Sequence, residues 1–359
     1  MRRRKFLLSA LFIIICVPSE SRAASLTGYT SFSSHEEIVA QAKKERKVRI
    51  IASMDPAGIK AAIAAFSRKY PFIEPYIQET KGSDADQRLL LEIKSGTAGE
   101  WDVIPISADF SSEYLPYLWT VDFSRMAREK ILHIPLGTID PQHPNRVASF
   151  THFQVTAYNP KLVPAAQVPK TWEDLLQPQW KGRKIAVDIR PSEIAALVPA
   201  WGLEKTVEFA RRIAAHQPVW VRGASRTLTS IIAGEIPMMA SPNFGSVKKM
   251  QVKDRTGLLQ YSSLEPVPVR FGNLQGILSS SQRRHAALLW IEWLLSPEAQ
   301  KIIDDIQFSS SLYVADSLVE RELRGKKLSV VDWEHHQSME KWISKVVEAY
   351  GFPKAEAQR

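Results

Sequence analysis

Short apolar runs alternate with amphipathic stretches in the first third of the chain. Residues 47–53 (KVRIIAS), 75–79 and 102–107 (DVIPIS) read as strands. Between them, apolar residues recur at helical spacing: Ile59, Ile63, Phe66 and Tyr70 in one stretch, and Leu89, Leu90 and Ile93 in the next. The order strand, helix, strand, helix, strand is typical of a parallel α/β sheet.

Capping signals mark where several of these helices begin. Asp55 is a cap residue followed by Pro56, which suits the first helical position, and Pro71 ends that helix. Residues 82–84 (GSD) open the second helix, and Ser296-Pro297-Glu298 opens a later one by the same logic.

A second α/β stretch follows a strand over residues 150–158, which Asn159-Pro160 closes. In it we expect a short helix capped by Thr171, a strand at 184–189, a helix at 202–214, a strand at 219–221, a helix opened by Ser225 or Thr227, and a strand at 235–241. A proline-rich connection at 265–268 then leads to a strand at 272–279 and a long helix with Ala286, Leu289, Trp290 and Trp293.

Two extended segments, near 150–158 and 265–274, flank this middle block. If both are crossings, the chain forms two lobes joined by a hinge, with a cleft between them. The predicted division assigns 24–152 and 272–310 to lobe 1, 153–271 to lobe 2, and 311–359 to C-terminal helices that pack on the lobes.

The N-terminus has the order of a secretory signal peptide. Arg2 to Lys5 give a positive start, residues 6–17 form an apolar run, and the small residues Ser21 and Ala23 precede a cleavage position. The alternative is an uncleaved anchor, but the run is shorter than the roughly 20 residues that span a bilayer. We therefore expect residues 1–23 to be removed and the protein to be periplasmic.

Charge and cysteine content exclude several classes. The chain is formally +9, and residues 1–23 hold +4 of this, so the remainder is mildly basic and has no dense basic block for nucleic acid. Cys16 is the only cysteine and lies in the predicted signal, which leaves no thiol for a disulfide or a metal.

Enzyme signatures are absent: the chain has no GxSxG, Walker, GxGxxG or HExxH motif. His335 and His336 follow Glu334, but neighbouring residues of a helix point about 100° apart and do not converge on one ion. We expect no enzyme activity, no cofactor and no resident metal.

Polar residues gather where predicted strands turn into helices, at the sheet edge where ligands of open α/β sheets bind. Helix N-termini there favour anions. The candidate ligand-binding residues are Ser53, Asp55, Lys81, Ser83, Ser107, Arg222 and Ser225. Taken singly, each serine, and Asp55 above all, is equally typical of a helix cap.

Two arginines and one further turn complete the candidate site. Arg190 and Arg222 each follow a predicted strand, where either clamps a carboxylate or phosphonate or makes a surface ion pair. Ser241 and Asn243 belong to a polar turn that would line the cleft.

Several words of the sequence together resemble a known family. They are AFSRKYPFI (65–73), RLLLEIKSG (88–96), DVI (102–104), YNPKLVP (158–164), TWEDLLQPQWKGR (171–183), AGEIPM (233–238) and LLSPEAQKII (294–303). Over about residues 45–310 the chain resembles the periplasmic solute-binding proteins of ABC importers, in the branch of ferric-ion, thiamine and phosphonate binders.

This resemblance implies the two-lobe periplasmic binding protein fold (type II), each lobe a sheet flanked by helices and hinged by two crossing segments. It also implies a small-molecule ligand held between the lobes and an ABC importer permease as partner, and we expect a monomer. Ferric binders of the branch hold iron with an adjacent tyrosine pair, whereas this chain has Pro242-Asn243-Phe244 in that region.

The main prediction is therefore capture of a small anion, such as a phosphonate, phosphate ester or carboxylate, by hinge closure. The alternatives are a ferric-iron or iron-chelate binder of the same fold, a periplasmic enzyme on a binding-protein scaffold, and a partner that delivers ligand to a membrane sensor.

Overall fold

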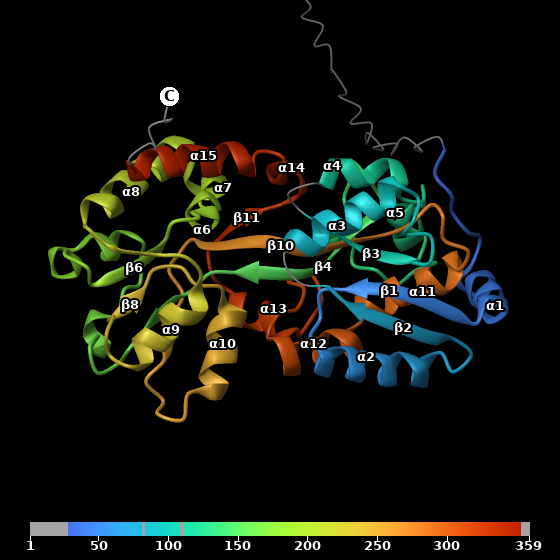
Figure 1. The fold of residues 1–359 in the computed structure, drawn as a ribbon, viewed down its shortest axis with the longest axis horizontal. Coiled ribbons are helices and arrows are strands. Elements are labelled where there is room, and N and C mark those ends of the chain that lie inside the picture. The colour runs from blue at the N-terminus through green and yellow to red at the C-terminus, as the bar shows by residue number, and fades with distance from the viewer. Residues whose placement is uncertain (1–27, 81–82, 108–110, 353–359) are drawn as a thin grey trace, which may run out of the picture.

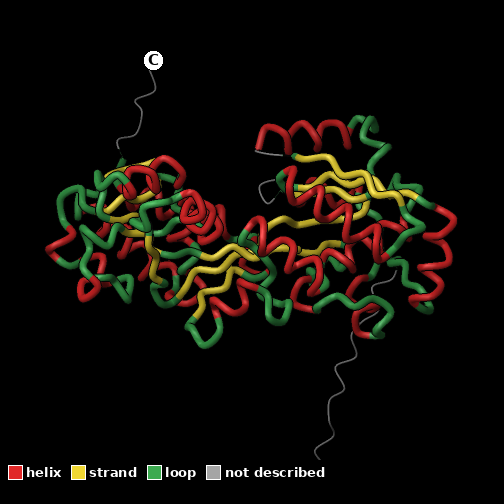
Figure 2. The backbone as a smooth tube through the Cα atoms, turned by 90° about the horizontal axis from the view of Figure 1, so that it is seen from below, coloured by secondary structure: helices red, strands yellow, loops and turns green. Residues whose placement is uncertain are grey.

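Two β-sheets, each covered by helices, organise the chain in a computed structural model that describes residues 28–80, 83–107 and 111–352. Figure 1 shows the larger sheet on the right and the smaller one on the left. Figure 2 shows the same two parts from below, joined in the middle by strands. The expected fold class, two sheets flanked by helices, is confirmed.

The larger sheet has the strand order β11-β10-β3-β1-β2, and β4 pairs with the opposite side of β10. Its strands are β1 (Lys47–Ala52), β2 (Glu74–Glu79), β3 (Val103–Ile106), β4 (Arg146–Phe153), β10 (Val267–Ile277) and β11 (Leu328–Val331). The helices of this part are α1 (His35–Glu45), α2 (Pro56–Lys69), α3 (Ser83–Lys94), α4 (Ser111–Tyr114), α5 (Phe123–Arg128), α11 (Arg284–Leu294) and α12 (Pro297–Gln307), with 3₁₀ turns η2 (Leu115–Tyr117) and η3 (Leu136–Thr138).

The smaller sheet has the strand order β7-β6-β8-β5-β9. Its strands are β5 (Thr156–Tyr158), β6 (Ile185–Asp188), β7 (Val219–Val221), β8 (Met238–Met239) and β9 (Gln260–Ser262). Around it lie α6 (Ser192–Ala195), α7 (Val198–Trp201), α8 (Leu203–Ala215), α9 (Ala224–Ile232) and α10 (Phe244–Lys253), with 3₁₀ turns η4 (Ala165–Gln167), η5 (Glu173–Leu176) and η6 (Pro178–Trp180). The C-terminal segment adds α13 (Leu318–Leu323), α14 (Trp333–His336) and α15 (Met339–Tyr350), and α15 packs on α8 and α6.

The start of α2 follows directly from the local sequence. Asp55 is extended and its carboxylate accepts a hydrogen bond from the N–H of Gly58 at 2.9 Å, while Pro56 occupies the first helical position. The helix then buries Phe66 against Trp290 and Trp293 of α11, with ring centroids 5.2 and 5.5 Å apart. This packing fixes the turn after β1, which faces the smaller sheet.

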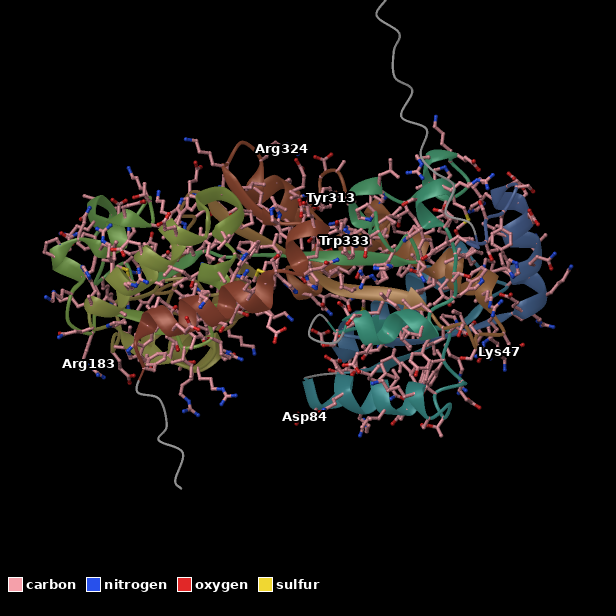
Figure 3. The ribbon with its side chains drawn as sticks, turned by 90° about the horizontal axis from the view of Figure 1, so that it is seen from above. Lys47, Asp84, Arg183, Tyr313, Arg324 and Trp333 are labelled. Carbon is pink, nitrogen blue, oxygen red and sulfur yellow. The ribbon has the colours of Figure 1, made fainter. Side chains whose placement is uncertain are left out.

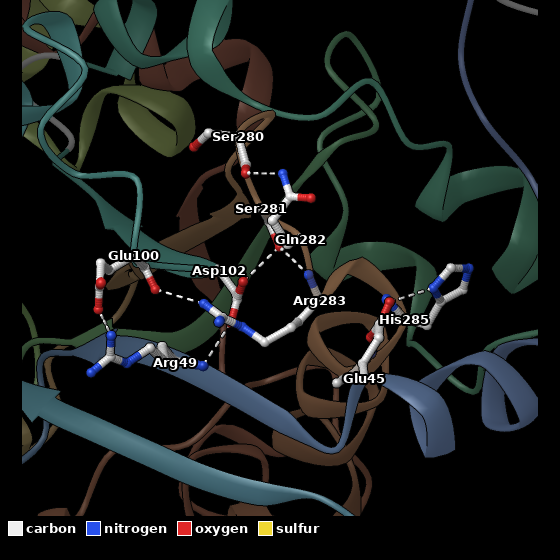
Figure 4. A network of polar contacts seen from close by, with 10 residues as sticks. Glu45, Arg49, Glu100, Asp102, Ser280, Ser281, Gln282, Arg283 and His285 are labelled. Atoms are coloured by element: carbon white, nitrogen blue, oxygen red, sulfur yellow. Dashed lines mark hydrogen bonds and ion pairs between the residues drawn. The ribbon is translucent and has the colours of Figure 1, made fainter.

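Asp102 ties the larger sheet together at the start of β3 (Figure 4). Its buried carboxylate accepts hydrogen bonds from the Arg49 N–H of β1, the Ser281 hydroxyl and the Arg283 Nε, each at 2.7 Å. One side chain thus joins β1 and β3 to the loop before α11. Each oxygen of this buried carboxylate accepts at least one hydrogen bond, as a buried charge requires.

The chain passes between the sheets at the two extended segments that the sequence indicates. Gln154 and Val155 separate β4 of the larger sheet from β5 of the smaller one, and residues 263–266 separate β9 from β10. The lobe boundaries themselves remain a prediction.

Several expected elements have different bounds. The strand at 150–158 is two strands, β8 is shorter than 235–241, and Thr171 precedes a 3₁₀ turn instead of an α-helix. β10 begins at Val267 and therefore includes Pro268. The pairing with β4 begins only at Val269, so Pro268 has a strand neighbour on the β11 side alone, where a proline is tolerated. The segment 311–359 supplies β11 in addition to helices.

The predicted signal peptide, residues 1–23 with Cys16, lies outside the described residues. Within the described ranges, no helix combines the length and the apolar character needed to cross a bilayer.

Candidate ligand cleft between the two sheets

A cavity of 360 Å³ lies where the two sheets face each other, and both contribute to it. Ser53 reaches it from the end of β1, and Asn243 from the turn after β8. His152 of β4 and Asn273 of β10 line it from the strands that connect the two parts. The structure therefore brings together Ser53 and Asn243, which are 190 residues apart in sequence.

A charged pair bridges the same region. Lys249 of α10 also lines the cavity, and its Nζ lies 3.8 Å from the Asp55 carboxylate at the start of α2. Both side chains are more than one-third exposed, so this contact is worth little to stability. It does show that α2 and α10 approach closely enough for one small ligand to touch both.

Asp188 joins two of the predicted ligand turns. At the end of β6, it accepts hydrogen bonds from the Arg190 backbone N–H at 2.9 Å and from the Arg190 guanidinium at 3.2 and 3.3 Å. Its second oxygen accepts the Gly223 N–H of the turn after β7 at 2.8 Å. Arg190 is thus the ion-paired arginine that the sequence allowed as an alternative, and the hydrogen bonds to Asp188 raise its pKa.

The turn after β7 forms its own cavity of 650 Å³, lined by residues 220–227. Arg222 and Ser225 are exposed there, at the N-terminus of α9, and Gly223 has φ 86°, which suits a glycine. Within the described residues, Arg222 makes no ion pair and no side-chain hydrogen bond, so its guanidinium is available to an anion.

A comparison with protein families identifies the class of protein to which the chain belongs. A sequence model of the family described as bacterial extracellular solute-binding protein matches residues 122–338, which is more than half of the chain. The chain belongs to this family.

Known relatives of this solute-binding protein include iron binders. A Fe(3+)-binding periplasmic protein of Serratia marcescens is 23% identical over 223 residues, which cover 59% of this chain and 63% of that relative. The chain therefore spans less than two-thirds of the length of this relative.

Solved structures share the fold. A Trichodesmium protein in complex with iron and citrate (18% identity, TM-score 0.66) and an open ferric iron-binding protein of Mannheimia haemolytica (18%, TM-score 0.67) are each matched over their whole length by 86% of this chain. A GABA receptor matches similarly, with 15% identity and a TM-score of 0.62, over 87% of this chain and all of its own. Identities this low establish the fold of the solute-binding protein and leave its ligand open.

Of the remaining predicted site residues, Asn243 lines the cleft cavity, whereas Ser83, Ser107 and Ser241 do not. Lys81 is outside the described residues, and Ser83 begins α3. Ser107 follows β3 and is half-buried. Ser241 is buried, while the Asn243 side chain caps α10 by accepting the Gly245 N–H at 2.9 Å. Asn243 and Asp55 are thus helix caps that also border the cleft.

Sequence reasoning missed His152, which lines the cleft from β4, and its strand neighbour Arg270, which lies outside this cavity. His152 and Arg270 are register partners on β4 and β10, and the Arg270 Nη2 lies 3.9 Å from the Glu193 carboxylate of α6. Removal from water and the nearby Arg270 charge lower the pKa of His152 to about 4, so the ring is neutral at pH 7. Polar residues inside the apolar word FTHFQVTAY were the available signal.

Clusters of metal-binding side chains bear on which ligand the cleft can hold. No group of three His, Cys, Asp or Glu side chains within the described ranges is arranged to hold a metal ion. The turn after β8 presents Asn243 and Phe244 instead of tyrosines. Among the described residues, the cleft offers the Lys249 ammonium and the amides of Asn243 and Asn273 to a ligand.

Proposed function

We propose that this protein captures ferric iron as a complex with a small organic acid, outside the cytoplasm, and passes it to the membrane permease of an ABC importer. The relatives named above support iron as the cargo, since one is described as a Fe(3+)-binding periplasmic protein and another is solved with iron and citrate. This favours the iron-chelate alternative over the metal-free anion that the sequence suggested.

The proposal rests on a contrast between the iron that the relatives bind and the side chains that this cleft offers. The described residues provide no cluster of anionic ligands for a naked ion. They do provide Arg222, which has no partner in that part of the chain, beside the free N–H groups at the start of α9. Such groups bind the carboxylates of a chelate, while the chelate supplies the metal ligands.

The arrangement of the cavity suggests how capture proceeds. Ser53 and Asn243 lie on parts of the chain that belong to different sheets. A ligand that contacts both stabilises the closed arrangement relative to the open one, which is the state that a permease would recognise. We propose a monomer that works in this way after removal of residues 1–23.

The test is thermal unfolding of residues 24–359 with ferric citrate, citrate alone, ferric nitrilotriacetate and methylphosphonate. Ligand at about 100 times its Kd adds about 2.7 kcal/mol of stability. We expect ferric citrate to stabilise the protein and Arg222→Ala to weaken its binding at least tenfold. Arg183→Gln, an exposed change far from the cleft, is the control.

A metal-free anion is the second candidate, because Arg222, which makes no ion pair with any described residue, serves a phosphonate or a carboxylate equally well. Stabilisation by methylphosphonate or citrate without iron, and no further gain with iron, would establish that candidate in place of the first. Equal stabilisation by ferric nitrilotriacetate and ferric citrate would contradict recognition of the acid.

A further inference from the structure

A cavity of 710 Å³ lies above the strands that join the two sheets, and this volume is within the range that holds small molecules. It lies between α4 on one side and α14 and α15 on the other, which face each other across the top of Figure 1. Its apolar wall is formed by Leu115, Phe271, Val331, Trp333, Met339 and Ile343.

Helix α15, which supplies part of this wall, lies beyond the region that defines the family. The family match ends at residue 338, and α15 begins at Met339. The helix is held firmly, since it packs on α8 and α6 and buries Val346 and Tyr350. A feature of this chain, and not of the matched family region, therefore completes the cavity.

An aromatic surface lies inside the cavity. Trp333 packs on Phe271 with ring centroids 4.8 Å apart and planes at 39° (Trp333 is labelled in Figure 3). The Trp333 Nε1–H is buried and has no hydrogen-bond acceptor within the described residues. Gln337 closes one side, because its amide donates to the Gln142 side chain at 2.9 Å.

Of the two arginines in the cavity, Arg146 is tightly paired with Asp140, whereas Arg270 has a buried donor without an acceptor among the described residues. Arg146 is buried with Asp140, whose carboxylate accepts its Nε–H at 2.9 Å. Arg270 lies at 3.9 Å from Glu193, and its buried Nε–H makes no hydrogen bond with the described residues. A buried donor without an acceptor costs free energy, and a ligand oxygen would recover it.

The other titratable groups around the cavity do not prevent Arg270 from binding an anionic ligand. Burial raises the pKa of Glu193, which weakens its compensation of the guanidinium. Burial and the Arg146 charge lower the pKa of His143, so it is neutral at pH 7. Glu340 is on the exposed rim and His336 is half-buried.

We infer that this cavity binds a carboxylate with an aromatic body, its carboxylate on Arg270 and its ring between Trp333 and Ile343. Guanidinium and carboxylate make charge-assisted hydrogen bonds, and the indole offers a stacking surface. The inference does not depend on iron, and it places a second ligand class in a cavity that shares no lining residue with the 360 Å³ cleft.

The experiment is calorimetric titration of residues 24–359 with 2-naphthoate, with 2-naphthamide, which lacks the charge, and with acetate, which lacks the ring. We expect 2-naphthoate to bind at least tenfold more tightly than either. Equal binding of 2-naphthoate and 2-naphthamide would remove Arg270 from the interaction, and no binding of 2-naphthoate at all would overturn the assignment.

Two pairs of variants locate the ligand. Arg270→Gln should weaken 2-naphthoate binding at least tenfold, whereas Arg183→Gln should not change it. Ile343→Trp fills the cavity and should block binding, whereas Val347→Trp, one turn further along α15 at an exposed position, should not. The filling variant keeps the test valid if Arg270→Gln unfolds.

Wild-type affinity in both Arg270→Gln and Ile343→Trp would contradict the inference. A parallel titration with ferric citrate separates it from the proposed function. Failure of ferric citrate with intact 2-naphthoate binding contradicts only the iron proposal, and the reverse pattern contradicts only this cavity.

Discussion

Gly272 lies directly beneath the ring of His152. A Cβ at position 272 would stand 2.3 Å from both Cδ2 and Nε2 of the imidazole, closer than non-bonded atoms approach. The two residues belong to the paired strands β10 and β4, so the absence of a side chain at 272 lets the imidazole lie across the floor of the cleft.

This relationship predicts a coupled effect. Gly272→Ala should destabilise the protein by about 1–3 kcal/mol, because the added methyl displaces the ring. In a His152→Ala background the same change should be neutral or slightly stabilising, since alanine suits a strand better than glycine. Urea unfolding of the four proteins measures the coupling, and equal costs in both backgrounds would show that the ring moves aside freely.

The Asp102 network predicts a large loss of stability. Asp102→Ala leaves the Arg283 guanidinium and two further donors without their acceptor, and should cost about 3–5 kcal/mol. Asp305→Ala removes an exposed pair with Lys301 and should change stability by less than about 0.5 kcal/mol. Similar midpoints of denaturation for the two variants would contradict the role assigned to Asp102.

Asp188 should control the order of the turns around Arg190 and Gly223. Asp188→Ala removes an acceptor shared by both turns, so we expect a loss of about 1–3 kcal/mol and faster hydrogen exchange of the Gly223 amide. Glu208→Ala, which breaks an exposed pair with Arg211 in the same part of the chain, is the control. Unchanged Gly223 exchange in Asp188→Ala would refute the link.

Glu292 and His35 should give stability a pH dependence. The hydrogen bond to Glu292 raises the pKa of His35. Burial acts to raise the pKa of Glu292, but the hydrogen bonds that Glu292 accepts from His35 and from the His133 N–H outweigh burial, so the pKa of Glu292 is lowered. The His35 contribution is therefore complete below its unfolded pKa of about 6.5 and is lost as pH rises through the raised folded value. The Glu292 contribution is present above its unfolded pKa and is lost as pH falls through the lowered folded value.

The measurement compares wild type with His35→Ala at pH 5.5 and pH 8. The variant should lose roughly 0.5–1 kcal/mol more at the lower pH, a modest amount because His35 is partly exposed. Glu292→Gln should remove most of this difference. A deficit that does not vary with pH would mean that His35 acts through packing alone.

Local signals in the sequence predicted the elements whose cause is local. The start of α2 at Asp55-Pro56 and of α12 at Ser296-Pro297 follow from capping alone, and both are confirmed. β11 was missed because Leu328 to Val331 is short and gains its place only by pairing with Val267 to Arg270, about 60 residues earlier. β10 was predicted too short because Pro268 argues against a strand unless only one side is paired.

The candidate site divides in the same way. Turns after strands are visible in the sequence, so Ser53, Arg222 and Asn243 could be predicted, and each lines a cavity in the structure. The partners of Arg190 and the placement of His152 depend on which strands lie side by side, which periodicity does not encode. The 710 Å³ cavity depends on α15, whose position is set by its packing on α8.

Strand β10 pairs with both β3 and β11 along one edge, and this has a consequence for biosynthesis. β3 borders its second half and β11 its first, and β11 ends at Val331, close to the C-terminus. The larger sheet therefore stays incomplete until residues 328–331 have been made, although β1 is made within the first 52 residues. A chain that stops at residue 310 would expose an open strand edge on β10 and should aggregate instead of folding as a shorter binding protein.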